Sequence, residues 1–130
     1  MRNYQRKKKN PYLLPHNAYM QTLYLIRDYE RLKEEYSRLL SDTPLPMDGQ
    51  PKGKGGIGRP VENKAIMLSS LSTKTDAVER AILAVPECYR KGVWENVMYG
   101  WRYPIGADVR TWQTYKQRFI YGVAKGLGIV

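Results

Sequence analysis

The chain has 130 residues, with 22 lysines and arginines against 12 aspartates and glutamates and a formal net charge of +10. A chain of this length most simply forms one domain, or one small domain with a helical extension, in which every helix contributes to the core. The length argues against an elaborate active site. The charge points first to polyanions, meaning nucleic acid or an anionic membrane; a soluble basic protein without such a partner is the alternative.

Cysteine and histidine occur once each, as Cys88 and His16. An intrachain disulfide is therefore excluded, a Cys/His metal set cannot be built, and a lone thiol suits a reducing cytoplasm. No secretory signal and no run of about 20 apolar residues is found, so we expect no membrane partner. No second histidine is present to activate Cys88, and we expect neither an enzyme nor a cofactor.

Residues 1–15 are predicted to form a basic flexible arm. Five of its first ten residues are basic, and Pro11 and Pro15 mark its end. A dense group of cations of this kind suits phosphate groups. The cations concerned are Arg6, Lys7, Lys8 and Lys9, with Arg2 before them.

Residues 16–85 are predicted to form a long helical hairpin with a Pro/Gly linker at 41–60. Asn17 is a good N-cap for the first helix, whose apolar positions repeat at spacings of four and three, like a coiled-coil seam. The seam consists of Leu25, Tyr29, Leu32, Tyr36 and Leu39. One uninterrupted helix of this kind would be roughly 35 Å long.

The second helix of the hairpin is expected to begin at Pro60, which suits a first helical turn, and to stop before Pro86. Its apolar stripe comprises Val61, Ala65, Leu68, Leu71, Thr75, Val78 and Ile82. Two helices of similar length with one narrow stripe each most economically form an antiparallel pair. We expect these helices to support a homodimer, although pairing within one chain and pairing between two chains both satisfy the pattern.

The linker contains Gly53-Lys54-Gly55-Gly56-Ile57-Gly58, which matches the G-x-G-x-x-G spelling of a dinucleotide site. That motif requires a preceding strand and a following helix within a βαβ unit. The flanking sequence predicts neither the strand nor the unit. We interpret the segment as a flexible basic linker.

Residues 86–130 are predicted to form a helix pair of helix-turn-helix type, which makes the whole chain all-α. The first helix starts at Pro86 and Glu87 and ends at Gly100, a C-cap, and Asp108 can N-cap the second. The apolar side of the first helix carries Tyr89, Val93, Trp94, Val97 and Met98. The apolar face of the second carries Trp112, Tyr115, Phe119, Ile120, Val123 and Leu127.

Another face of the last helix contains no acid. Arginine, glutamine and threonine offer donors and acceptors that match base edges in the major groove, whereas lysine and flanking arginine suit phosphates. For double-stranded DNA we expect base reading by Arg110, Gln113, Thr114 and Gln117. We expect phosphate contacts from Lys116, Arg118 and Arg102, together with Arg6, Lys7, Lys8 and Lys9 of the arm. A basic surface helix without a partner, or one that docks an acidic protein, fits the same pattern.

The loop before this helix gathers Tyr99, Trp101, Arg102 and Tyr103. Loop aromatics of this kind either stack on bases or sugars, as in single-strand binders, or close a small core. The sequence leaves both interpretations open.

The last 45 residues or so also carry a recognisable pattern. It runs Val85-Pro86-Glu87-x-Tyr89-Arg90 and, after a loop, Trp112-x-x-Tyr115-Lys116-x-Arg118-Phe119-Ile120-Tyr121-x-Val123-Ala124-Lys125-x-Leu127-Gly128. This pattern resembles the C-terminal part of the ArpU/RinA-type phage regulators, whose C-terminal domain is similar to the DNA-reading module of bacterial sigma factors. The resemblance implies a phage or prophage transcriptional regulator of late or lysis genes. It would act at promoters of host RNA polymerase, in the cytoplasm of the bacterial host at the nucleoid.

The sequence leaves open a second class of function. A phage assembly protein, such as a small terminase subunit or another packaging adaptor, would use the long hairpin to form a ring and would bind DNA with little sequence preference. Its oligomeric size separates it from a regulator.

Overall fold

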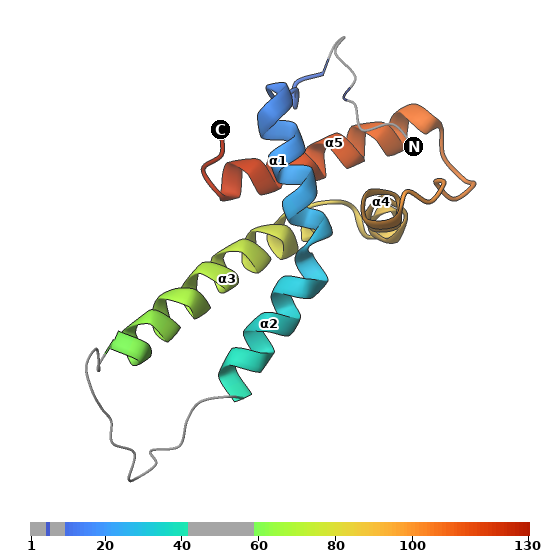
Figure 1. The fold of residues 1–130 in the computed structure, drawn as a ribbon. Helices are drawn as coiled ribbons and strands as arrows, with labels where there is room; N and C mark the ends of the chain where they lie inside the picture. Colours follow the sequence, from blue (N-terminus) through green and yellow to red (C-terminus); the bar gives the residue numbers. More distant parts are fainter. Residues whose placement is uncertain (1–4, 6–9, 42–58) are drawn as a thin grey trace.

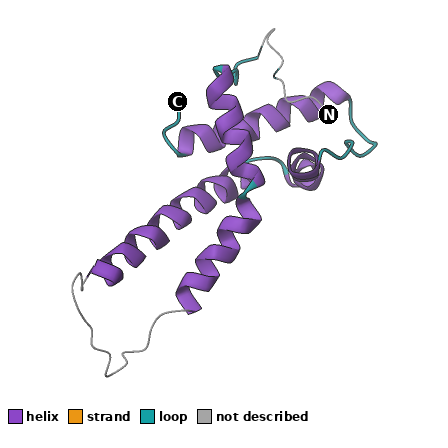
Figure 2. Cartoon of the chain, in the orientation of Figure 1, coloured by secondary structure: helices purple, strands orange, loops and turns teal. Residues whose placement is uncertain are grey.

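The computed structural model describes residue 5, residues 10–41 and residues 59–130; for residues 59–62 it describes the backbone only. Five helices make up these parts of the chain: α1 (His16–Arg27), α2 (Tyr29–Ser41), α3 (Arg59–Leu83), α4 (Glu87–Tyr99) and α5 (Val109–Gly126). No strand occurs in the described ranges (Figure 2). The predicted all-α class is confirmed. Most of the linker at 41–60, including its glycine motif, lies outside the described residues.

The helix that the sequence predicts from Asn17 through the seam is divided in two. Between α1 and α2, Asp28 adopts φ −86° and ψ 0°, which leaves the regular helical region. Its Oδ2 accepts a hydrogen bond from Nη2 of Arg31 at 2.8 Å, an (i, i+3) ion pair that supports the first turn of α2. The chain bends at Asp28, so that α1 crosses α5 while α2 runs beside α3 (Figure 1). The expectation of one uninterrupted helix is wrong.

The start of α1 also differs from the prediction. Pro15 occupies the N-cap with φ −55° and ψ 147°, and its carbonyl accepts the first helical hydrogen bond from the N–H of Tyr19 at 2.9 Å. No side chain caps this end. Asn17 therefore lies inside the helix, because proline already supplies the extended conformation that an N-cap residue needs.

Helices α2 and α3 lie side by side and run in opposite directions (Figure 1). Leu32, Leu71 and Thr75 are buried between them. At one end of the pair, the hydroxyl of Tyr29 donates to Oε2 of Glu79. This arrangement agrees with the predicted antiparallel hairpin as far as α2 is concerned, whereas α1 makes its main contacts with α5 and α4.

The junction between α3 and α4 is held by one arginine. Arg90 donates from Nε to the carbonyl oxygen of Val85 at 2.7 Å and from Nη2 to that of Leu83 at 2.8 Å. These bonds satisfy carbonyls at the end of α3 that have no helical partner. The sequence predicted that this helix starts at Pro86 and Glu87; in the structure α4 begins at Glu87 and Pro86 is its N-cap.

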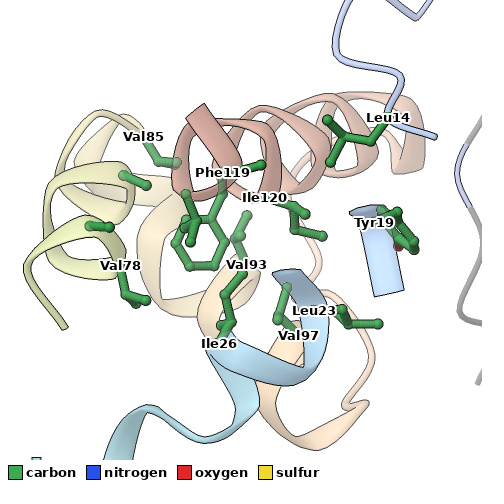
Figure 3. Close-up of a cluster of buried hydrophobic side chains, with 14 of the residues drawn as sticks. Leu14, Tyr19, Leu23, Ile26, Val78, Val85, Val93, Val97, Phe119 and Ile120 are labelled. Carbon is green, nitrogen blue, oxygen red and sulfur yellow. The ribbon is translucent and has the colours of Figure 1, made fainter. Parts of the chain in front are cut away.

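The buried core draws on α1, α3, α4 and α5 (Figure 3), and Tyr29 at the start of α2 is packed, partly buried, against it. Its fully buried side chains include Leu23, Val78, Val93 and Phe119, from α1, α3, α4 and α5 respectively. The predicted segments 16–85 and 86–130 therefore share one core. The α4–α5 pair is supported by α1 and α3 rather than standing alone.

The last residues of the expected flexible arm belong to the fold. Leu14 is buried in the core, and its backbone is paired with the side chain of Gln5 by two hydrogen bonds, of 2.7 and 2.8 Å. The ring of Tyr12 contacts the ring of Tyr121 on α5, with centroids 5.6 Å apart. Residues 10–15 therefore contradict the predicted arm, because their apolar side chains have a surface on α5 to cover.

Candidate nucleic-acid interface

The residues at the two ends of the loop between α4 and α5 determine where α4 ends and where α5 begins. Gly100 ends α4 in the left-handed conformation, with φ 73° and ψ 17°, which glycine adopts without steric cost. Asp108 is extended at the N-cap of α5, and its carbonyl accepts hydrogen bonds from the N–H groups of Thr111 and Trp112. The carboxylate of Asp108 makes no capping bond. The predicted cap positions are right, although at Asp108 only the backbone does the capping.

The apolar face of α5 is anchored as predicted. Trp112, Phe119, Ile120 and Val123 are buried in the core cluster. Tyr115 and Leu127 are partly buried against it. The direction of the opposite, solvent-facing side of α5 is thereby fixed.

The four residues predicted to read bases do not share one exposed face. Arg110 and Thr114 are exposed, and Gln113 is half-buried. Gln117 is only 9% exposed. The placement of Gln117 on an accessible reading face is therefore wrong.

The residues predicted to contact phosphates are also divided. Arg118 and Arg102 are exposed. Lys116 is only 9% exposed, and burial, with a smaller contribution from the charge of Arg27, lowers its pKa to about 8. The expectation that Lys116 lies on an accessible surface is therefore wrong. Arg6, Lys7, Lys8 and Lys9 lie outside the described residues.

The two errors have different physical causes. Helix α1 crosses α5, and the residues before α1 cover a further strip of it, so that the buried arc of α5 is wider than its apolar stripe (Figure 1). Gln117 falls within that wider arc. Lys116, four residues after Trp112 and four before Ile120, lies within the apolar stripe itself. A signal was present in α1, where Tyr19, Leu23 and Ile26 form an apolar set outside the coiled-coil seam and therefore require a second helix to cover them.

The exposed side of α5 remains basic after this correction. Arg110, Thr114 and Arg118 are exposed at intervals of four residues, which places them on one stripe of the helix, and Lys125 is exposed near its end. The range Val109–Gly126 contains no aspartate or glutamate. The hydroxyl of Thr114 donates to the carbonyl oxygen of Arg110 at 2.9 Å, so its oxygen is left to accept from a partner. We call Arg110, Thr114 and Arg118 the outer row.

One residue of the family pattern has a structural explanation that the sequence did not provide. Arg90 belongs to the pattern that resembles the phage regulators, and in the structure its guanidinium caps the end of α3. The Val85-Pro86 corner supplies one of its acceptors. An arginine placed four residues after a helix-ending proline was the available signal.

The chain matches no model of a known protein family, no curated protein and no solved structure. The resemblance to ArpU/RinA-type regulators therefore stays a hypothesis that rests on the quoted residues. Across the described ranges, none of the helices has the length and apolar character that crossing a membrane requires.

Proposed function

We propose that the protein is a phage- or prophage-encoded transcriptional regulator that binds double-stranded DNA sequence-specifically through α5. The observation that carries this proposal is the outer row on a helix without acids. Ordinary solvated helix faces mix acids with bases, because neighbouring opposite charges are favourable. A face with cations only is suited to a polyanion.

The outer row has the chemistry and dimensions for a major groove. Residues four apart on a helix are about 6 Å apart along its axis, and the major groove admits an α-helix. Arg110, at the N-terminal end of α5, would contact the acceptors of a guanine, since recognition helices read bases with their N-terminal residues. Arg118 lies two turns further on and suits a phosphate, as does Arg102 in the loop.

The resemblance to the phage regulators suggests which genes and promoters the protein would act on, and the narrow apolar seams of the hairpin suggest a dimer. The regulator would act on late or lysis genes at promoters of the host RNA polymerase, and so at the nucleoid in the host cytoplasm. A homodimer through α2 and α3 would pair two copies of α5 and thereby double the DNA contact.

Selection of bound fragments from a random duplex pool, at low and at near-physiological salt, tests the proposal. We expect a consensus that persists at the higher salt. Arg110→Ala should relax the consensus at one position, with a loss on the order of tenfold for the preferred base. Arg118→Ala should weaken all sequences alike and reduce the slope of log affinity against log salt by about one.

Arg38→Ala is the matched control, because Arg38 is an exposed arginine on α2 and its loss changes the charge equally. Gln117→Ala should leave the consensus unchanged, since Gln117 is buried. Binding only at low salt, without any consensus, would reduce the charge to a general polyanion effect and overturn sequence-specific recognition.

One observation favours a second candidate, a phage assembly protein such as a small terminase subunit or packaging adaptor. The α2–α3 pair extends away from the other helices (Figure 1) and carries the exposed apolar side chains Leu40, Ile66 and Met67. Exposed apolar residues on such an extension suit self-association. Light scattering separates the candidates, because a ring of many subunits supports the adaptor and a monomer or dimer supports the regulator.

A further inference from the structure

Two aromatic side chains at the end of α4 face solvent. Tyr99 is 48% exposed and Trp101 is 56% exposed. Their ring centroids are 4.9 Å apart and their planes are tilted by 37°. We call Tyr99 and Trp101 the aromatic pair. Large aromatic surface left in water is unfavourable, so it suggests a partner.

The aromatic pair is held in place by polar contacts. Nδ2 of Asn96, a buried residue, donates to the carbonyl oxygen of Trp101 at 2.7 Å. Gly100, between the two aromatics, takes the left-handed conformation. On the other side, the hydroxyl of Tyr99 donates to Oε2 of Glu30 on α2 at 3.2 Å. The rings are thus preorganised, which reduces the entropy lost on binding.

The third aromatic residue of this loop has a different role. Tyr103 is half-buried and stacks on Trp112, with ring planes 8° apart and centroids 5.4 Å apart. Core closure therefore accounts for Tyr103. It does not account for the aromatic pair, whose rings contact each other outside the core cluster.

We propose that the aromatic pair, together with Arg102, binds unpaired bases of single-stranded DNA. The rings would stack on the bases, and the exposed guanidinium of Arg102 would contact the backbone phosphate. Stacking of this kind suits every base, because every base has an aromatic face. The inference rests on the proposed DNA-binding function and adds a second class of DNA, the opened strand, to the duplex that α5 would read.

The charges around the aromatic pair favour single-stranded DNA as the ligand and favour one orientation of its backbone. Glu30 and Glu95 lie on the Tyr99 side and raise the pKa of the Tyr99 hydroxyl, Glu30 having the larger effect. A phosphate backbone would be repelled there. Arg102 follows Trp101 directly, and α5 beyond it contains no acid. The backbone would therefore run on the side of Trp101 and Arg102, with only base faces reaching Tyr99.

Fluorescence anisotropy with the full chain tests the inference, using labelled oligothymidylate of about 12 nucleotides, within the site size of single-strand binders. At near-physiological salt, Trp101→Ala should weaken oligothymidylate binding about tenfold or more. Trp101→Phe should retain most of the affinity but lose the quenching of exposed tryptophan emission on binding. Ile105→Ala, a change at a fully exposed apolar residue of the same loop, is the matched control and should bind like the wild type.

Duplex binding by the same variants separates this inference from the proposed function. We expect Trp101→Ala to keep the duplex affinity, and Arg118→Ala to lower it while oligothymidylate still binds with quenching. Equal oligothymidylate affinity of the wild type and Trp101→Ala overturns the inference, as does a wild type that does not bind the oligothymidylate. If duplex binding persists in either case, the proposed function stands; if it is absent as well, both fall.

Discussion

Gly92 of α4 lies against the indole ring of Trp112 of α5, so closely that a Cβ atom at Gly92 would come within 2.6 Å of Cζ3 of Trp112. The same Cβ would lie 2.8 Å from Cδ of Pro104 in the loop between the two helices. The absence of a side chain at Gly92 therefore allows the indole ring of Trp112 to pack directly against the backbone of α4.

Replacing Gly92 by alanine should destabilise the protein. Alanine favours a helix over glycine by about 1 kcal/mol, but overpacking a core typically costs about 1–3 kcal/mol. We expect a net loss, seen as a lower midpoint in urea unfolding followed by circular dichroism. Gly126→Ala is the control, because a Cβ there would meet Ala77 at an ordinary 3.5 Å. Equal stability of Gly92→Ala and the wild type would mean that the indole moves away freely.

Gly92 also shows what the sequence can and cannot predict. The sequence alone indicates that Gly92 lowers the helix propensity of its segment. The segment forms a helix nevertheless. The need for glycine at this position comes from its contact with Trp112, which lies twenty residues further along the chain and could not be predicted from the neighbouring residues. Helix existence, the start of α4 next to Pro86 and the cap positions Gly100 and Asp108 were predictable, since they depend on neighbours in the chain.

The candidate site was predictable only in part, because exposure on α5 depends on which helix crosses it. Arg110, Thr114 and Arg118 were correctly expected to be accessible. Lys116 and Gln117 were not placed correctly, because polar side chains normally mark a solvated face. For Lys116 the spacing of four residues from Trp112 and from Ile120 already pointed to the apolar stripe, whereas Gln117 is buried beside that stripe. A sequence period identifies one buried stripe, not the width that several neighbours give it.

The guanidinium of Arg90 should matter for stability rather than for DNA binding. Arg90→Ala removes two hydrogen bonds from a charged donor to the carbonyls of Leu83 and Val85. We expect a loss of about 1–2 kcal/mol in the free energy of unfolding. Lys91→Ala, at the exposed next position, should change that free energy by no more than about 0.5 kcal/mol. Matching effects of the two variants in urea unfolding would contradict the capping role.

The hydrogen bond from Tyr29 to Glu79 should make the α2–α3 pairing sensitive to acid. This bond is the largest cause, with Lys33 after it, of the lowered pKa of Glu79. A carboxyl group with a lowered pKa in the folded state adds stability above its unfolded pKa and loses it as the pH falls through the folded value. Tyr29→Phe should cost about 1–2 kcal/mol at pH 7, and its difference from the wild type should shrink as Glu79 becomes protonated.

Unfolding curves of the wild type and Tyr29→Phe, measured from neutral pH into the acid range, check this expectation. Tyr36→Phe serves as the control, because Tyr36 is a half-buried tyrosine of the same seam. A Tyr29→Phe difference that stays constant down to the lowest pH would assign the effect to packing of the ring and not to the carboxylate.

Lys116 should reduce the stability of the protein at neutral pH. Its pKa of about 8 in the folded state lies below the ordinary value of 10.5, with burial as the main cause and Arg27 as the second. The folded chain therefore loses this proton before the unfolded chain does. Stability from this group rises with pH between about 8 and 10.5 and is constant, at its lower level, below that window.

Lys116→Met keeps the length of the side chain and removes the charge. It should raise the free energy of unfolding by about 1–3 kcal/mol at pH 7, and this advantage should fade toward pH 10, where the wild-type amine is neutral in the folded state. Urea unfolding across this pH range measures the difference, with Lys125→Met, at an exposed position of α5, as the control. Because Lys116 is buried, Lys116→Met should also bind duplex DNA like the wild type. A loss of affinity equal to that of Arg118→Ala would mean that α1 moves aside on binding and that Lys116 reaches a phosphate after all.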